Sequence, residues 1–145
     1  MPTGAFVFDF VLLIDDSSID NFVNQKMIER NAFAKNIKTF TNASGALKYL
    51  SDVDENQIHE KEVPSLIFLD LNMPLINGFC FLELYEKLSP FIKSRCKIVI
   101  LTSSIDPLDR KQALKDKNII AFYNKPLIST NFNELNQLLS GKQLL

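Results

Sequence analysis

The sequence predicts an α/β domain in which an open parallel β-sheet is covered by helices on both faces. Short apolar runs alternate along the chain with segments whose apolar residues recur at helical spacing. Several of these runs are apolar throughout, as is typical of parallel strands that are buried on both faces. Five runs, each followed by a helical segment, give a (βα)5 pattern and a doubly wound sheet.

The five expected strands follow one another at regular intervals. They are "FVLLI" (10–14), "IKTF" (37–40), "SLIFL" (65–69), "KIVIL" (97–101) and "IIAFY" (119–123).

The segments between the strands each carry an apolar face at helical spacing. These faces are Ile19, Phe22, Val23 and Met27; Ala43, Ala46, Leu47 and Leu50; Phe81, Leu84, Tyr85 and Leu88; and Phe132, Leu135, Leu138 and Leu139. The fourth helix, around residues 107–116, is the weakest prediction because it has few apolar positions and many charges.

Helix start signals agree with these segments. Ser17 precedes the first helix, Asp106 stands before Pro107, and Ser129 or Thr130 opens the last helix. Residues 52–64 are expected to form one longer polar connection.

We expect residues 1–145 to form a single domain with a core at about 8–140. A chain of 145 residues is long enough to bury a core, and no repeat or low-complexity tract interrupts it.

Composition argues against several classes of partner. The net charge is −1 and no Lys/Arg stripe is clustered, so nucleic acid is not an expected partner. No apolar run approaches the roughly 20 residues that span a bilayer. The N-terminus lacks a basic region and is interrupted by Asp9, so it does not resemble a signal peptide. We therefore expect a cytoplasmic protein without a membrane partner.

The cysteines and the histidine do not suggest a structural metal site. Cys80 and Cys96 have no CxxC spacing and no histidine nearby, which favours reduced thiols. His59 lies in a polar stretch and is expected to be a solvated loop residue.

Polar side chains follow four of the expected strands. Because the carboxyl ends of parallel strands share one edge of a sheet, we expect these side chains to converge there. Three crowded carboxylates repel one another unless a cation offsets them, and oxygen ligands suit Mg²⁺. The strand-end residues are Asp15-Asp16, Asp70, Thr102-Ser103-Ser104 and Lys125-Pro126.

Each of these elements alone has an ordinary structural explanation. An Asp-Asp pair and the Asn-Met-Pro segment are common in turns and helix starts, Thr-Ser-Ser fits a loop and cap, and Lys-Pro occurs on surfaces. The functional interpretation depends on all four appearing in order, each after a different strand.

The chain resembles the receiver domain of bacterial two-component response regulators over about residues 8–140. The matching motifs are "LLIDDS", "IFLDLNMPLINGF", "IVILTSS" and "FYNKP". The resemblance implies a flavodoxin-like sheet with strand order 2-1-3-4-5. It also implies that Asp70 accepts a phosphoryl group from a phosphohistidine on a sensor histidine kinase or a histidine phosphotransfer protein.

The same resemblance implies a Mg²⁺ site. Asp16 would bind the metal directly and Asp15 would bind it through water. Asp70 and the backbone carbonyl of Asn72 would complete the protein ligands.

Further roles follow from the resemblance at the ends of the last two strands. Thr102 would hydrogen-bond the phosphoryl group, Lys125 would pair with its oxygens, and Ser103 occupies a position that is usually a small residue. Phe122 falls at an aromatic switch position. A cis bond before Pro126 would turn the lysine over the site.

Phosphorylation is then expected to draw Thr102 inward, to let Phe122 swing into the vacated space, and to shift the helix at about 107–116. The expected output is protein contact with an unknown target, as a monomer or a phosphorylation-dependent dimer. We expect no enzymatic activity beyond the domain's own phosphorylation and dephosphorylation.

Two other classes share parts of this pattern. A flavodoxin-type module needs a first loop of Ser, Thr and Gly amides for an anionic phosphate, but this loop begins with two carboxylates. A haloacid-dehalogenase-type phosphatase requires a second acid two residues after its nucleophile, where this chain has Asn72. Bound flavin colour, or turnover of a generic phosphate monoester, would distinguish these classes.

Overall fold

The sheet has the predicted parallel topology. The computed structural model describes residues 7–56 and 62–144, and five strands form one parallel sheet in the order β2-β1-β3-β4-β5. The strands are β1 (Phe8–Ile14), β2 (Ala34–Phe40), β3 (Leu66–Leu69), β4 (Lys97–Thr102) and β5 (Ile119–Asn124). The predicted fold class and strand order are therefore confirmed.

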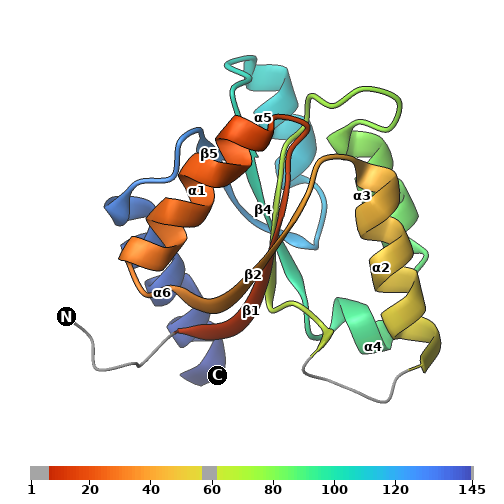
Figure 1. Ribbon diagram of the computed structural model, residues 1–145, viewed down its shortest axis with the longest axis horizontal. Helices are drawn as coiled ribbons and strands as arrows, with labels where there is room; N and C mark the ends of the chain where they lie inside the picture. Colours follow the sequence, from red (N-terminus) through yellow and green to blue (C-terminus); the bar gives the residue numbers. More distant parts are fainter. Residues whose placement is uncertain (1–6, 57–61, 145) are drawn as a thin grey trace.

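Helices cover both faces of the sheet. In Figure 1, α1 and α6 lie on one face, and α2 and α3 lie on the other. The helices are α1 (Ser18–Arg30), α2 (Ala43–Asn56), α3 (Gly78–Glu86), α4 (Pro90–Lys93), α5 (Pro107–Leu114) and α6 (Ser129–Leu144).

Two details of the helices differ from the sequence prediction. The single turn α4 was not expected, and Pro90 at its first position fixes the backbone for a helix start. The expected polar connection 52–64 begins later than predicted because α2 continues to Asn56. His59 lies outside the described residues.

Side chains of β1 point alternately to the two faces of the sheet and contribute to two hydrophobic clusters. Leu12 and Ile14 pack with the cluster that includes Leu50 of α2 and Phe81 of α3. Val11 and Leu13 pack on the other face, in the cluster that includes Phe132 of α6. Successive residues of a strand point to opposite faces, so one continuous apolar run serves both layers.

The predicted helix starts are confirmed. The Ser17 hydroxyl accepts a hydrogen bond from the Asp20 amide at 3.1 Å, and the Asp106 carboxylate accepts one from the Leu108 amide at 3.0 Å. Such caps satisfy backbone donors that have no partner within the helix. The short α5 is also the weakly packed helix that the sequence predicted, with Ala113 as its one buried residue.

The apolar face predicted for α1 is wrong. The buried residues of α1 are Asn21, Asn24 and Ile28. Three of the four residues of the expected stripe face outward: Ile19 is 73% exposed, Phe22 61% and Val23 40%. The fourth, Met27, is partly buried and packs against the cluster that includes Phe132.

Hydrogen bonds explain why asparagines face inward. The Asn21 side chain donates to the backbone oxygens of Asp15 at 3.0 Å and Phe40 at 3.3 Å, where β1 and β2 end. The Asn24 side-chain oxygen accepts from the backbone N–H of Leu127 at 3.0 Å. Buried backbone groups beyond the ends of strands need such partners, and this need determines the orientation of α1.

The cysteines are free thiols, as the sequence predicted. Cys80 and Cys96 are both free, the first exposed and the second buried. Within residues 7–56 and 62–144, no helix is long and apolar enough to cross a membrane.

The orientation of α1 predicts that two substitutions change stability by very different amounts. Asn24→Ala should lower the free energy of unfolding by about 1–3 kcal/mol, because the buried Leu127 N–H loses its acceptor. Phe22→Ala, at an exposed position, should change it by less than about 0.5 kcal/mol. Urea unfolding followed by circular dichroism measures both. A larger loss for Phe22→Ala than for Asn24→Ala would contradict the observed orientation.

Candidate functional site

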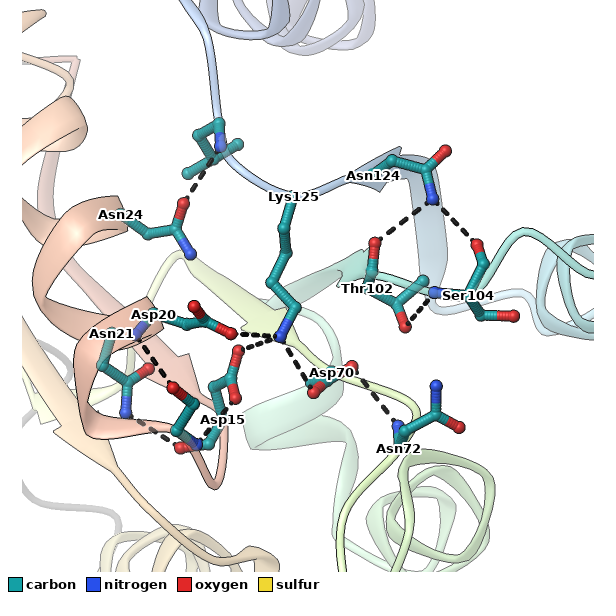
Figure 2. A network of polar contacts seen from close by, with 12 residues as sticks. Asp15, Asp20, Asn21, Asn24, Asp70, Asn72, Thr102, Ser104, Asn124 and Lys125 are labelled. Atoms are coloured by element: carbon teal, nitrogen blue, oxygen red, sulfur yellow. Dashed lines mark hydrogen bonds and ion pairs between the residues drawn. The ribbon is translucent and has the colours of Figure 1, made fainter.

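Three strand ends bring acidic and basic side chains together, as predicted. Figure 2 shows the ammonium of Lys125, which follows β5, between the carboxylates of Asp15, Asp20 and Asp70. The Lys125 Nζ lies 2.7 Å from an Asp15 oxygen, 2.8 Å from an Asp20 oxygen and 3.2 Å from an Asp70 oxygen. Asp15 and Asp70 are buried, with 4% and 3% exposure.

Within the part of the chain that the structure describes, the Lys125 ammonium is the cation that pairs with both buried carboxylates. Burial raises the pKa of Asp15, and the hydrogen bond from Lys125 opposes this effect. Burial of Lys125 alone lowers its pKa, but hydrogen bonds from its ammonium to Asp15 and Asp20 and the charge of Asp70 outweigh burial, so the pKa is raised. The ammonium therefore stays charged throughout the physiological pH range.

The same edge offers a set of oxygen ligands. Asp15, Asp16 and Asp70 can each direct one carboxylate oxygen into a group whose members lie within 4.8 Å of one another. The Ser17 N–H donates to Asp15 Oδ1 at 2.9 Å, and the Asn72 N–H donates to Asp70 Oδ1 at 3.3 Å. These bonds orient the two buried carboxylates. Oxygen-only ligands and one exposed member, Asp16, fit Mg²⁺ that keeps several waters.

The turn after Asp70 depends on Gly78. The Gly78 N–H donates to the Leu71 carbonyl at 2.9 Å. A Cβ at position 78 would lie 2.7 Å from both the Asp70 carbonyl oxygen and the Leu71 Cα. Only glycine permits this close approach, which holds α3 against the residue that follows Asp70.

The loop after β4 is held by side chains on both of its sides. Thr102 is fully buried, and its hydroxyl oxygen accepts from the Ser104 N–H at 3.2 Å. The Asn124 side chain donates to the carbonyls of Thr102 at 3.2 Å and Ser104 at 2.8 Å. The Ser104 hydroxyl donates to Asp109 of α5 at 2.6 Å. The loop thus connects the site directly to α5.

Comparison with known proteins identifies the architecture. The family model described as the response regulator receiver domain matches residues 11–139. The chain belongs to the response regulator receiver domain family. No curated protein sequence is significantly similar to it.

Solved structures of receiver domains resemble this one closely. A two-component response regulator from Cytophaga hutchinsonii shares 32% identity with a TM-score of 0.80, covering 91% of this chain and 97% of that one. A response regulator receiver protein from Dyadobacter fermentans shares 28% identity with a TM-score of 0.77, covering 93% and 98%. The receiver domain of the histidine kinase CKI1 from Arabidopsis thaliana shares only the fold, at 16% identity and a TM-score of 0.67, covering 94% and 91%. Membership in this family implies a role in phosphorelay signalling.

Two features that the sequence singled out in this receiver domain, the Lys125-Pro126 bond and Ser103, lie beside Lys125. The Lys125-Pro126 bond is cis, as predicted. Ser103 is exposed beside Lys125 and Pro126, where these residues and α1 line an open depression of about 360 Å³.

The predicted switch residue of the receiver domain already lies inside. Phe122 is 7% exposed and packs in the core cluster on the α2–α3 side. The Arg110 guanidinium lies 5.4 Å from the centre of its ring, and Arg110 Nη1 donates to the Phe122 carbonyl at 3.3 Å. The expected movement on phosphorylation stays a prediction, and in this structure the ring already packs in the core beside Arg110.

Sequence reasoning missed three polar residues of the receiver site: Asp20, Asn24 and Asn124. A signal for the first two was present, because residues four apart lie on the same side of a helix. Polar residues at positions 20, 21 and 24 alternate with the apolar stripe, and that stripe was interpreted as the buried face. Asn124 stands directly before Lys125, but nothing in the sequence indicates which carbonyls it contacts.

Proposed function

We propose that this receiver domain is a phosphoacceptor whose Asp70 takes a phosphoryl group from a phosphohistidine on a sensor histidine kinase or a histidine phosphotransfer protein. The observation that carries this proposal is the position of Asp70. It is a buried carboxylate held 3.2 Å from the Lys125 ammonium and grouped with the Asp15 and Asp16 carboxylates.

In the proposed transfer, an Asp70 oxygen forms a bond to phosphorus while the bond from phosphorus to the histidine nitrogen breaks. The electron pair of that bond stays on the imidazole, which is released neutral or protonated by solvent. Lys125 donates hydrogen bonds to the transferred oxygens, on which negative charge spreads in the transition state. Mg²⁺ held by Asp15, Asp16, Asp70 and the Asn72 carbonyl would neutralise charge on the phosphoryl group.

We propose that the signal then travels through Thr102. Its oxygen already accepts a hydrogen bond from the Ser104 N–H, so the hydroxyl proton can be donated to a phosphoryl oxygen. A shift of Thr102 would move the loop that Ser104 and Asp109 join to α5. Because α5 buries little apolar surface, it can move at low cost. The surface of α5, β5 and α6 is our proposed output surface, for a target protein or for a phosphorylation-dependent dimer.

Exposed apolar residues beside the pocket support a protein phosphodonor. Ile19, Phe22 and Val23 of α1 are exposed, and so is Ile128 at 50%, just after Lys125-Pro126. Surface apolar groups that gather beside a reactive carboxylate favour contact with a protein over contact with a small phosphate ester. We propose no turnover of a separate substrate, so the domain catalyses only its own phosphorylation and dephosphorylation.

Phosphorylation should require both Asp70 and Mg²⁺. Acetyl phosphate with Mg²⁺ should add one phosphoryl group, which peptide mass spectrometry should locate at Asp70. Asp70→Asn, or EDTA, should abolish labelling, because the nucleophile or the charge neutralisation is lost. Asp9→Asn is the matched control, since Asp9 is an exposed acid near the start of β1. Undiminished labelling of Asp70→Asn or in EDTA would refute the proposal.

The exposed face of α1 should matter for a protein donor and not for a small one. With a phosphorylated kinase or phosphotransfer protein that labels the wild type, Phe22→Ala should slow transfer at least about fivefold, because an aromatic anchor is lost. Its rate with acetyl phosphate should be unchanged. Leu84→Ala, at an exposed position of α3, is the control and should change neither rate. Equal slowing with both donors would contradict the assignment of α1 as a contact for the partner.

A further inference from the structure

Lys125 has three carboxylate partners, and these differ in whether they could also bind a metal ion or accept a phosphoryl group. An ammonium group has three protons to donate, and the structure supplies one acceptor for each in Asp15, Asp20 and Asp70. Asp15 and Asp70 also belong to the group of carboxylates that could hold a metal ion, whereas Asp20 does not. Asp70 is in addition the proposed phosphoacceptor.

Metal binding and phosphorylation therefore weaken the interactions of Asp15 and Asp70 with Lys125. A bound divalent cation attracts the oxygens of Asp15 and repels the ammonium. Phosphorylation turns one Asp70 carboxylate oxygen into the bridging oxygen of an acyl phosphate, which carries less charge. Asp20 alone can keep its hydrogen bond to Lys125 in every state of the site.

The position of Asp20 is itself fixed by the fold. Its N–H donates to the Ser17 hydroxyl in the first turn of α1. Asn24, one turn later, accepts from the N–H of Leu127, two residues after Lys125. The start of α1 and the segment around Lys125 are thus joined at two points, and one of them is the ion pair of Asp20 with Lys125.

We propose that Asp20 is a positioning residue for phosphoryl transfer, which holds the Lys125 ammonium beside Asp70 when the metal engages Asp15. This inference rests on the proposed phosphoacceptor function. The Lys125 side chain is only 12% exposed, so the pair is better shielded than an ordinary surface ion pair. The Asp20 side chain is 41% exposed, which limits the expected effect.

The first test is independent of phosphorylation. A ¹H–¹⁵N spectrum of the lysine ammonium groups in Mg²⁺ should show a Lys125 signal protected from rapid proton exchange. Asp20→Asn should lose that signal. Glu29→Gln, which removes the same charge from α1 at an exposed position away from Lys125, should keep it. A protected Lys125 signal in Asp20→Asn would overturn the proposal, whether or not the protein accepts a phosphoryl group.

The second test is kinetic. Asp20→Asn should lower the maximal rate of phosphorylation by acetyl phosphate about two- to fivefold, the range expected for a partly exposed ion pair. Asp20→Glu should recover part of the loss, and Glu29→Gln should show none. In a Lys125→Met background, Asp20→Asn should have no further effect, because Asp20 acts through the lysine.

The outcomes separate three explanations. An equal effect of Asp20→Asn with and without Lys125 would overturn the positioning role and indicate a general charge or folding effect, which urea unfolding of the same variants would register. A wild type that is never phosphorylated would refute the proposed function, while the ammonium spectrum would still decide whether Asp20 holds Lys125.

Discussion

The arrangement at the carboxyl edge of the sheet depends on one ammonium that neutralises buried carboxylates. Asp15 and Asp70 are almost completely buried, and each would carry a large desolvation cost without a cation nearby. Lys125 lies within hydrogen-bonding distance of both. With Asp16 and Asp20 counted, four acids meet one lysine, so the site retains negative charge that favours a divalent cation.

Much of the surrounding structure serves to keep these charges in place. The last four residues of β1 and all of β3 are buried, so these apolar segments give Asp15 and Asp70 rigid supports. Gly78 allows α3 to approach the backbone after Asp70. The asparagines of α1 bind the backbone at the ends of β1 and β2 and beyond Lys125. The buried face of α1 is polar because its asparagines hydrogen-bond backbone groups at the ends of β1 and β2 and at Leu127. Ile19, Phe22 and Val23 remain exposed.

The apolar runs predicted the strands, and the geometry of parallel sheets predicted the convergence of Asp15, Asp16, Asp70 and Lys125. The strand order followed from the resemblance to receiver domains. The sequence did not predict the orientation of α1. An apolar stripe at helical spacing usually marks a buried face, and nothing local shows that Asn21 and Asn24 have backbone partners elsewhere in the chain. Side-chain contacts between distant segments, such as Arg110 over Phe122 or Asp20 with Lys125, were likewise beyond sequence patterns.

The central claim is that Lys125 is the counterion of the buried carboxylates and that Mg²⁺ can add to or replace its effect. Urea unfolding of Lys125→Met, with and without Mg²⁺, tests it most directly. Without metal the variant should lose roughly 3 kcal/mol or more of stability, because two buried carboxylates lose their partner. Mg²⁺ should stabilise it more than it stabilises the wild type. Lys26→Met, in an exposed ion pair of α1, should show neither effect. A Lys125→Met variant that is as stable as the wild type without metal, and that gains no more from Mg²⁺, would contradict the account.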